Sequence, residues 1–495
     1  MQQSLLISFL DNKTIVIKII KKNHQNMTHQ FHSSILRAYD IRGIYQKTLY
    51  NQDAFFIGKS FATILHQNNY TNIVVACDGR ASSPVLKQEL INGLTSCGIN
   101  VFDAGLGPTP MLYFAVYHQQ ADAGIMITGS HNPKDHNGFK ITLKNNKPFF
   151  GEEILKLAEI VKNQHFMVGN GSVEKINVMQ AYINRLLVDL KITKPLKIAF
   201  DAGNGATGEI LQQLSKQLQE QFSCQTILLY PQIDANFPNH HPDPAVPENL
   251  ADLIDCVLKN NCDLGIAFDG DGDRIGAVDG QGNIIFGDQL MVFYAQDVLA
   301  SNPSATIIAD VKASDKLFSA IKNAGGNAVM CKTGNTFIKA KMQETKALLA
   351  GEMSGHIFFA DKYYGFDDAL YASIRLLNIA SNSQNSLAEK LKQLPVSYST
   401  AEIKIETSEE DKFVIVQFLQ DKLTVNKQNF NNIDGIRVSN NNGWWLLRAS
   451  NTQALLVARC EGNSPASLGL LKAELKQYLQ NLPANFEFKM PAELA

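Results

Sequence analysis

The chain has 495 residues, of which 45% are hydrophobic and 19% are charged, and its formal net charge at pH 7 is −2. This composition is typical of a globular protein, and the small net charge argues against a general nucleic-acid or anionic-membrane partner. Single hydrophobic cores stop growing well below this length, so we expect roughly three or four domains.

Two apolar runs, at residues 5–10 and 15–20, precede Met27. We do not expect a signal peptide, because no basic segment precedes the runs, charged residues interrupt them and no small-residue cleavage site follows. Residues 1–26 are expected to be either an upstream, misassigned start or a poorly ordered extension. No run reaches the roughly 18 apolar residues that a membrane-spanning helix needs. The seven scattered cysteines never form a CxxC pair, which is typical of reduced core residues in a cytoplasmic protein.

Three segments share one local pattern, in which an apolar strand runs into a loop rich in Gly, Asp and Ser that opens a helix. They are residues 73–84 (IVVACDGRASSP), 198–208 (IAFDAGNGATG) and 307–314 (IIADVKAS). Their spacing of about a hundred residues predicts three successive α/β units. The glycine-rich loop at 201–208 matches neither GxGxxG nor a P-loop, so we interpret it as a structural turn between strand and helix.

The pattern changes after Pro395. We expect strands at 401–406, 433–439, 444–450 and 454–461, and helices at 409–423 and 466–482. Strands in antiparallel succession with two helices predict a small α+β domain, distinct from the three units before it.

The run Asp269, Asp271 and Asp273 alternates with glycine, is followed by Arg274 and directly follows an apolar strand at 264–268. Carboxylate oxygens are the ligands that Mg²⁺ prefers, and the ends of strands are where open α/β sheets bind ligands. An EF-hand is excluded, because its sixth position requires glycine and its twelfth requires glutamate. Those positions hold Arg274 and Gly280 here. The run therefore predicts a magnesium site.

A second run, residues 128–133 (TGSHNP), follows the apolar strand at 123–127. A serine in a tight loop after a strand is exposed and fixed, as a covalent nucleophile must be. His131 and Lys140 are near Ser130 in sequence, but no GxSxG motif surrounds the serine, so an acyl-transfer hydrolase is not expected. By itself the run is equally compatible with an Asn/Ser turn.

Three further runs add polar groups suited to a phosphorylated sugar. Residues 351–356 (GEMSGH) offer a carboxylate, a hydroxyl and an imidazole for sugar hydroxyls. Residues 448–452 (RASNT), between two expected strands, offer a guanidinium, hydroxyls and an amide for a phosphate. Residues 37–43 (RAYDIRG) add two arginines and a tyrosine. A surface loop would explain any one of these runs alone.

Taken in this order, the runs resemble those of the α-D-phosphohexomutase family, and most closely its bacterial phosphomannomutase/phosphoglucomutase branch. The resemblance extends from about Leu36 to the end of the chain. It implies an α/β protein, with three successive α/β domains with mixed sheets followed by a C-terminal α+β domain, around a central cleft. It also implies reversible interconversion of hexose 6-phosphate and hexose 1-phosphate, of mannose, glucose or both, through a phosphoserine and a hexose 1,6-bisphosphate intermediate.

The resemblance implies a division of the chain and a role for each run. The expected divisions are an N-terminal extension (1–26), α/β domains with the phosphoserine loop (27–175), the metal loop (176–280) and the sugar-binding loop (281–395), and an α+β domain with the phosphate clamp (396–495). The residues expected at the reacting end are Ser130, His131, Lys140, Arg274 and Arg42. Ser130, Asp269, Asp271 and Asp273 are the expected Mg²⁺ ligands. The residues expected to bind substrate are Tyr39, Lys312, Asn335, Glu352, Ser354, His356, Arg448, Ser450, Asn451 and Thr452.

The expected ligands and partners follow from the same resemblance. They are Mg²⁺, small hexose phosphates and a hexose 1,6-bisphosphate activator, with no nucleic acid and no membrane, and the chain is expected to be a monomer or weak dimer. A phosphoserine beside three carboxylates requires a divalent cation, and Arg274 would help offset its charge.

Two positions depart from the usual family pattern. Asn335, in KTGN, stands where the closest relatives usually have histidine, and Ala454 replaces a proline that often follows the clamp. Asn335 can donate a hydrogen bond but cannot shuttle a proton, which leaves the sugar preference and the rate open. The alternatives are a phosphoglucosamine mutase and a sugar-phosphate-binding protein without turnover. The TGSHNP and RASNT runs favour the mannose/glucose branch.

Overall fold

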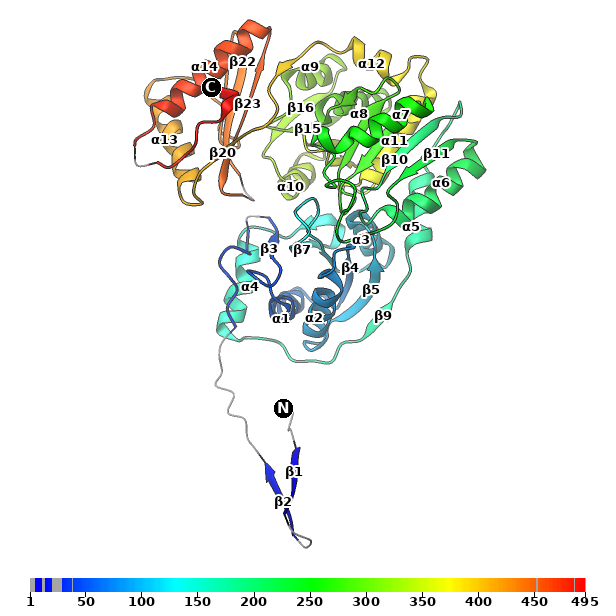
Figure 1. Ribbon diagram of the computed structural model, residues 1–495, viewed down its shortest axis with the longest axis vertical. Helices are drawn as coiled ribbons and strands as arrows, with labels where there is room; N and C mark the ends of the chain where they lie inside the picture. Colours follow the sequence, from blue (N-terminus) through cyan, green and yellow to red (C-terminus); the bar gives the residue numbers. More distant parts are fainter. Residues whose placement is uncertain are drawn as a thin grey trace.

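The computed structural model describes residues 5–10, 14–19, 29–37, 39–450, 453–484 and 486–494. Its ribbon confirms the predicted fold class, with three α/β domains followed by an α+β domain (Figure 1). Domain 1, in blue and cyan, lies below domains 2 and 3, in green and yellow, and domain 4, in orange and red, lies beside domain 3. At the N-terminus, strands β1 (Leu5–Leu10) and β2 (Thr14–Ile19) pair as an antiparallel hairpin that the sequence did not predict.

Domain 1 is a mixed sheet with helices on both faces. Its elements are β3 (Ile41–Ile44), α1 (Asn51–Gln67), β4 (Asn72–Cys77), α2 (Ser83–Thr95), β5 (Asn100–Leu106), α3 (Thr109–His118), β6 (Ala123–Ile127), β7 (His136–Leu143), η1 (Lys144–Asn146), β8 (Lys147–Pro148), α4 (Glu152–Asn163) and β9 (Val173–Lys175). The strand order is β3-β7-β6-β4-β5-β9, and β4 runs parallel to β5 and β6. Strand β4 is almost wholly apolar because its two faces enter different core clusters, Val75 in one and Val74 in the other.

Domain 2 carries the acidic run on a strand connection. Its elements are α5 (Met179–Leu187), β10 (Lys197–Asp201), α6 (Gly208–Phe222), β11 (Gln225–Leu229), η2 (Pro247–Leu250), α7 (Ala251–Asn260), β12 (Leu264–Phe268), β13 (Ile275–Asp279) and β14 (Ile284–Ile285). The strand order is β11-β10-β12-β13-β14, with β12 parallel to β10 and antiparallel to β13. The acidic run therefore connects two paired strands at the carboxyl end of β12, as the apolar run before it predicts.

Domain 3 has a similar mixed sheet, in the order β16-β15-β17-β18. Its elements are α8 (Gly287–Ser301), β15 (Thr306–Asp310), α9 (Asp315–Asn323), β16 (Asn327–Cys331), α10 (Asn335–Thr345), β17 (Leu349–Gly351), β18 (Ile357–Phe359), α11 (Ala369–Asn382) and α12 (Leu387–Gln393). Strand β15 is parallel to β16 and β17, and β18 returns antiparallel. The expected sugar-binding loop lies in the connection from β17 to β18.

Domain 4 is an antiparallel sheet packed against two helices, as predicted. Its elements are β19 (Tyr398–Ser399), β20 (Ile403–Glu406), α13 (Asp411–Val425), β21 (Ile436–Asn440), β22 (Gly443–Ala449), β23 (Leu455–Gly462), α14 (Pro465–Gln480) and η3 (Ala492–Leu494). Strand β23 lies between β22 and β20, and its apolar face forms a core with α13 and α14. The expected phosphate clamp is the connection from β22 to β23.

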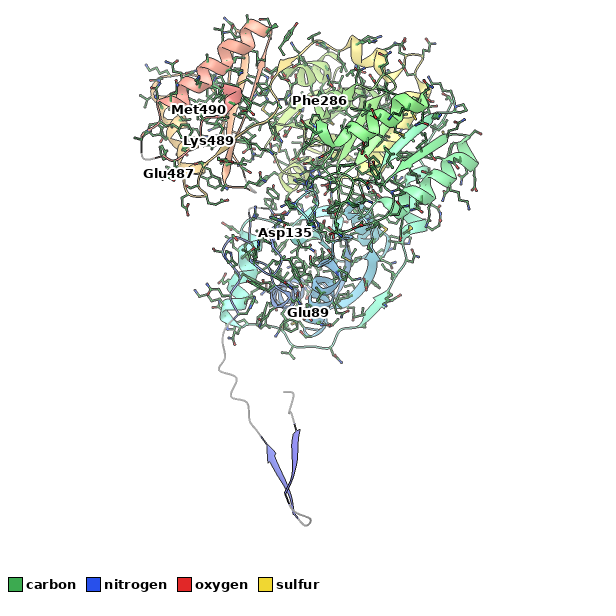
Figure 2. All side chains as sticks on the ribbon, viewed as in Figure 1. Glu89, Asp135, Phe286, Glu487, Lys489 and Met490 are labelled. Carbon is green, nitrogen blue, oxygen red and sulfur yellow. The ribbon has the colours of Figure 1, made fainter. Side chains whose placement is uncertain are left out.

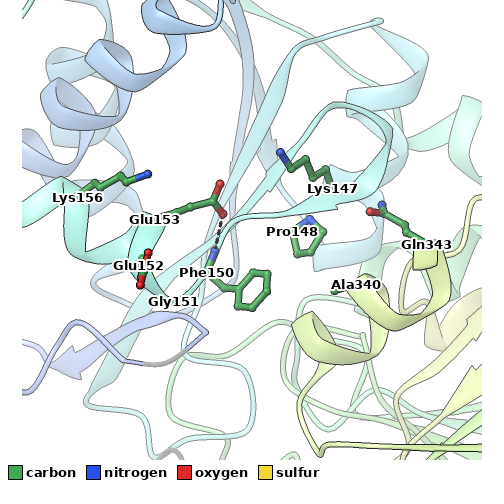
Figure 3. A pocket seen from close by; sticks show the side chains of 9 residues that line it. All are labelled: Lys147, Pro148, Phe150, Gly151, Glu152, Glu153, Lys156, Ala340 and Gln343. Atoms are coloured by element: carbon green, nitrogen blue, oxygen red, sulfur yellow. Dashed lines mark hydrogen bonds between the residues drawn. The ribbon is translucent and has the colours of Figure 1, made fainter. Parts of the chain in front are cut away.

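Domains 1 and 3 also meet beside the main cleft. There a shallow hollow lies between the β8–α4 connection and α10, with Phe150 on one side and Gln343 on the other (Figure 3). Gln343 donates to the carbonyl oxygen of Asn146 at 3.2 Å, and Phe150 packs edge-on against Phe337 of α10. These contacts join the two domains beside the cleft. Within the described part of the chain, no helix is both long enough and apolar enough to cross a membrane.

Candidate active site

A cleft of about 1370 Å³ lies between the domains, and all four contribute to its lining. Half-exposed Phe286, at the start of α8, is one lining residue and is labelled in Figure 2. The predicted site residues in the lining are Tyr39, Arg42, Ser130, His131, Lys140, Arg274, Lys312, Asn335, Glu352, Ser354, His356, Arg448 and Ser450. Asn451 and Thr452, also predicted to bind phosphate, lie outside the described residues. Residues predicted from runs more than 400 positions apart therefore meet in one cleft.

The three aspartates of the acidic run converge in the protein interior. Asp269, Asp271 and Asp273 are completely buried, and each offers a carboxylate oxygen within 4.8 Å of the others. The two glycines between the aspartates are required for different reasons. A Cβ on Gly270 would approach the carbonyl oxygen of Ser130 to 2.4 Å, and Gly272 has a φ of +74°. The Asp-Gly alternation thus brings the carboxylates directly against the serine loop.

The charges of the acidic run are only partly offset. Lys140 lies 2.7 Å from Asp271 and also contacts Asp273. Burial and the neighbouring carboxylates raise the pKa of Asp269 well above its ordinary value, whereas Lys140 lowers the pKa of Asp271 despite burial. One oxygen each of Asp271 and Asp273 is buried without a hydrogen-bond partner. Unpartnered, buried carboxylate oxygens around one point fit a divalent cation.

Ser130 is held in an unusual backbone conformation at the edge of this cluster. Its φ is +49°, in the left-handed region that costs free energy for a residue with a side chain. The Ser130 hydroxyl donates to Asp269 at 2.8 Å and lies 3.2 Å from Nδ1 of His131. The Ser130 N–H donates to the hydroxyl of Thr128 at 2.8 Å. The serine oxygen is therefore fixed beside the candidate cation site.

Two residues without a predicted role hold the serine loop from behind. The guanidinium of Arg80 is 1% exposed and donates to the carbonyl oxygens of Ser130, Asn132, Pro133 and His136 at 2.6 to 3.0 Å. Asp78 accepts from the Thr128 hydroxyl at 2.8 Å and from the N–H of Gly129 at 3.2 Å. The signal in the sequence was the CDGR run at the end of β4. The strand-to-loop pattern predicted that this run lies in domain 1, but the sequence predicted no role for its charged residues.

Two arginines of the predicted reacting end are fixed by side-chain partners. Arg42 contacts Asp40 at 2.7 Å and donates to the side-chain oxygen of Asn132 at 2.8 Å. Arg274 donates from Nε to Nε2 of His356 at 3.0 Å. Since Nε2 accepts this bond, the imidazole carries its proton on Nδ1, which lies 3.1 Å from Asp367. Each arginine is thus held in place by side-chain partners, Arg42 in domain 1 and Arg274 against the imidazole of His356.

The predicted sugar-binding residues lie on the domain 3 side of the cleft. Glu352 accepts from the N–H of Gly334 and, at 3.1 Å, from the hydroxyl of Ser354. Asn335 donates to Asp367 at 2.9 Å and accepts from the hydroxyl of Thr336, so both of its polar side-chain atoms have partners within the protein. This internal bonding fixes the orientation of the Asn335 amide.

The predicted anion-binding cations come from domains 3 and 4. Lys312 lies 2.5 Å from Glu402, a residue for which the sequence predicted no role. The charge of Lys312, added to by Arg448, lowers the pKa of Glu402 to about 2. Arg448 donates from Nε to Asp434 at 2.8 Å, and this carboxylate outweighs burial and raises the pKa of Arg448. Domains 3 and 4 therefore each contribute a cation to the cleft, and a carboxylate holds each cation in place.

Comparisons with known proteins agree with this geometry. Models of phosphoglucomutase/phosphomannomutase α/β/α domains I, II and III match residues 33–167, 179–282 and 286–398, and the C-terminal domain model matches 402–477. The protein is an intramolecular phosphotransferase, a mutase. The chain belongs to the phosphoglucomutase/phosphomannomutase family, and the resemblance inferred from the sequence is confirmed.

The relatives are similar over nearly their whole length. A phosphomannomutase/phosphoglucomutase of Pseudomonas putida is 45% identical over 89% of this chain and 94% of its own length. A phosphoglucomutase of Neisseria gonorrhoeae is 43% identical over 91% of this chain and 97% of its own. The crystal structure of a family protein from Burkholderia thailandensis has a TM-score of 0.86 at 39% identity, covering 93% of this chain and 100% of its own.

Proposed function

We propose that this protein interconverts hexose 6-phosphates and hexose 1-phosphates of mannose, glucose or both, through a phosphorylated Ser130. The names of the relatives, phosphomannomutase/phosphoglucomutase and phosphoglucomutase, support this substrate class. The observation that carries the mechanism is the Ser130 oxygen, which is 2.8 Å from Asp269 in a cluster of completely buried carboxylates and faces a cleft with fixed cations at its other end.

The acidic run fits Mg²⁺ as the resident cation. Asp269, Asp271 and Asp273, with an oxygen of phosphorylated Ser130, would hold the ion, and two of the aspartates have buried oxygens without hydrogen-bond partners. When bound, the ion supplies positive charge that polarises the phosphoryl group for transfer. Lys140 then serves to limit repulsion among the carboxylates, because its ammonium contacts Asp271 and Asp273 directly.

The transfer itself is a displacement at phosphorus. The free hydroxyl of the bound hexose phosphate forms a new P–O bond while the P–Oγ bond of Ser130 breaks, and the hydroxyl proton passes to a base in the cleft. Arg42 and Arg274, which both line the cleft, would stabilise charge on the moving phosphoryl group. The resulting 1,6-bisphosphate reorients and returns its other phosphoryl group to Ser130. Added hexose 1,6-bisphosphate is the activator because it restores lost phosphoserine.

The other end of the substrate needs a grip that does not react. Glu352 and Ser354 are suited to sugar hydroxyls, and Arg448, Ser450 and Lys312 to the second phosphate. We include Asn451 and Thr452 in this grip from their sequence positions. A substrate held at both ends presents either its 1- or its 6-position to Ser130, depending on which phosphate occupies the clamp. This two-ended binding explains why the cleft includes a fourth domain.

A coupled assay with three substrates tests the proposal. Mannose, glucose and glucosamine 1-phosphates are supplied in turn, with Mg²⁺ and glucose 1,6-bisphosphate as primer, and Ser130→Ala serves as the blank. We expect turnover of mannose or glucose 1-phosphate that greatly exceeds that of glucosamine 1-phosphate. Preference for glucosamine 1-phosphate would assign the chain to the other substrate class, and no turnover of any of the three would overturn the proposal.

A further inference from the structure

Asp434, in the turn before β21, is joined to two domains at once. Its Oδ2 accepts from Nε of Arg448 in domain 4 at 2.8 Å and from the N–H of Thr333 in domain 3 at 3.0 Å. Both partners line the cleft, whereas Asp434 is not among the described residues that line it. The carboxylate therefore contacts two residues of the cleft wall without lining the cleft itself.

The turn that carries Asp434 is built against Arg448. Gly435 has a φ of +80°, and a Cβ there would approach the Arg448 Cα to 2.7 Å. Glycine therefore permits both this backbone conformation and the close approach. Gln420 of α13 donates to the carbonyl oxygen of Gly435 at 2.8 Å and fixes the turn from the other side. Asp434 is thus held at a set position relative to the Arg448 backbone.

The domain 3 side of the link leads directly to the sugar-binding loop. Next to Thr333, the N–H of Gly334 donates to Glu352, the carboxylate proposed to bind sugar hydroxyls. A second route runs through buried Asp310, which accepts from the Thr333 hydroxyl at 3.1 Å and from the N–H of Met353 at 3.2 Å. A continuous set of hydrogen bonds therefore joins Arg448 to the loop at residues 351–356.

From these contacts we infer that Asp434 is a positioning residue, which fixes the phosphate-binding Arg448 at a set distance from the sugar-binding loop. A guanidinium held at Nε by a carboxylate keeps its orientation and presents its terminal N–H groups to a phosphate. Because the same oxygen also accepts from the N–H of Thr333, it connects the clamp in domain 4 to the sugar-binding side of domain 3. This inference rests on the proposed role of Arg448 as a phosphate ligand.

A double-mutant cycle tests the inference in the full-length protein. The variants are Asp434→Ala, Arg448→Ala and the double variant, each assayed with glucose 1-phosphate, Mg²⁺ and glucose 1,6-bisphosphate primer. We expect Asp434→Ala to raise KM about tenfold, as for loss of one charge-assisted hydrogen bond. In the Arg448→Ala background the same change should alter KM by less than about twofold, because the group that Asp434 orients is already gone.

Asp315→Asn is the matched control, since Asp315 pairs with a different arginine, Arg437, across the same two domains at 2.8 Å. Its KM should stay near that of the unmodified protein. Asp434→Asn, which keeps the shape and an acceptor for Thr333, should give an intermediate KM and provides the measurement if the alanine variant does not fold. If the KM of the double variant equals the product of the two separate effects, the residues act independently and the inference is overturned. An unchanged KM in Arg448→Ala would instead overturn the proposed clamp itself.

Discussion

The two ends of the cleft are constructed differently. At the serine end, three completely buried carboxylates follow one strand, and Gly270 between them lies directly against the backbone of Ser130. At the clamp end, each cation is held by a carboxylate from another part of the chain, Lys312 by Glu402 and Arg448 by Asp434. The serine end therefore draws its carboxylates and its serine from two short runs that meet in the fold, whereas the clamp end depends on single ion pairs between segments. Substitutions at the first should remove the chemistry, and those at the second should weaken binding.

The largest effect is expected for Ser130→Ala. In the proposed mechanism this residue carries the phosphoryl group, and no other hydroxyl among the described residues hydrogen-bonds to Asp269, so the turnover rate should fall by a factor on the order of 10⁴ or more. Steady-state assays measure the rate, and intact mass spectrometry after incubation with glucose 1,6-bisphosphate measures phosphorylation. The variant should take up no phosphate and keep its far-UV circular dichroism spectrum. Retention of a few per cent of the activity would contradict the phosphoserine mechanism.

The next effect concerns the cation site. Asp271→Asn removes one negative charge with little change of shape, so affinity for Mg²⁺ should fall at least about tenfold and activity should fall with it. Electron paramagnetic resonance with Mn²⁺ as the probe measures binding independently of turnover. Asp279→Asn is the control, because Asp279 is an equally buried carboxylate that hydrogen-bonds within its own β13–β14 turn. Loss of activity with unchanged Mn²⁺ affinity would remove Asp271 from the ligand set.

The elements that could be predicted from sequence are those with strong local signals. The strands that precede the serine loop and the acidic run were predicted with their observed bounds, β6 (Ala123–Ile127) and β12 (Leu264–Phe268). Such strands are recognisable because a buried strand in a sheet covered on both faces is a continuous apolar run. The antiparallel partners β7 and β13 were not predicted, since pairing direction depends on segments that meet only in the folded chain.

The site shows the same division. Runs that hold several polar groups within a few positions, such as Asp269 to Asp273, were recognisable because their spacing carries the chemistry. The residues that orient them were not, because single residues such as Arg80 or Asp434 resemble any charged loop residue in sequence. Their partners are 50 and 101 positions away, at Ser130 and Thr333, and only the fold brings these groups together.

A third prediction tests whether the serine end depends on the backbone contacts of Arg80. Lysine keeps the charge but cannot donate to four carbonyl oxygens in one plane, so in Arg80→Lys the Ser130 oxygen should move and kcat should fall by about 10²-fold. KM should change little, since the clamp end is untouched. Arg375→Lys, at an equally buried arginine that pairs with Asp361 and Asp297, is the control for lost stability. Equal losses of kcat in both variants would show that Arg80→Lys acts through general destabilisation of the fold.

The smallest expected effect lies outside both ends, in the domain 2 loop that packs beside the serine loop. His240 lies 2.9 Å from buried Asp201, and although burial disfavours its charge, this hydrogen bond and the charge of Asp201 raise the pKa of His240. A raised folded-state pKa means that the pair stabilises the fold fully below the unfolded value near 6.5, and that this contribution is lost as pH rises through the folded value.

His240→Gln should therefore lower the thermal midpoint by about 2 °C at pH 6 and by less at pH 8.5. Scanning calorimetry at both pH values measures the difference, with exposed His165→Gln as the control. A larger loss at pH 8.5 would show that His240 acts as a neutral hydrogen-bond partner. In that case the charge of His240 would contribute nothing to the stability of this loop, in contrast to the ion pairs at both ends of the cleft.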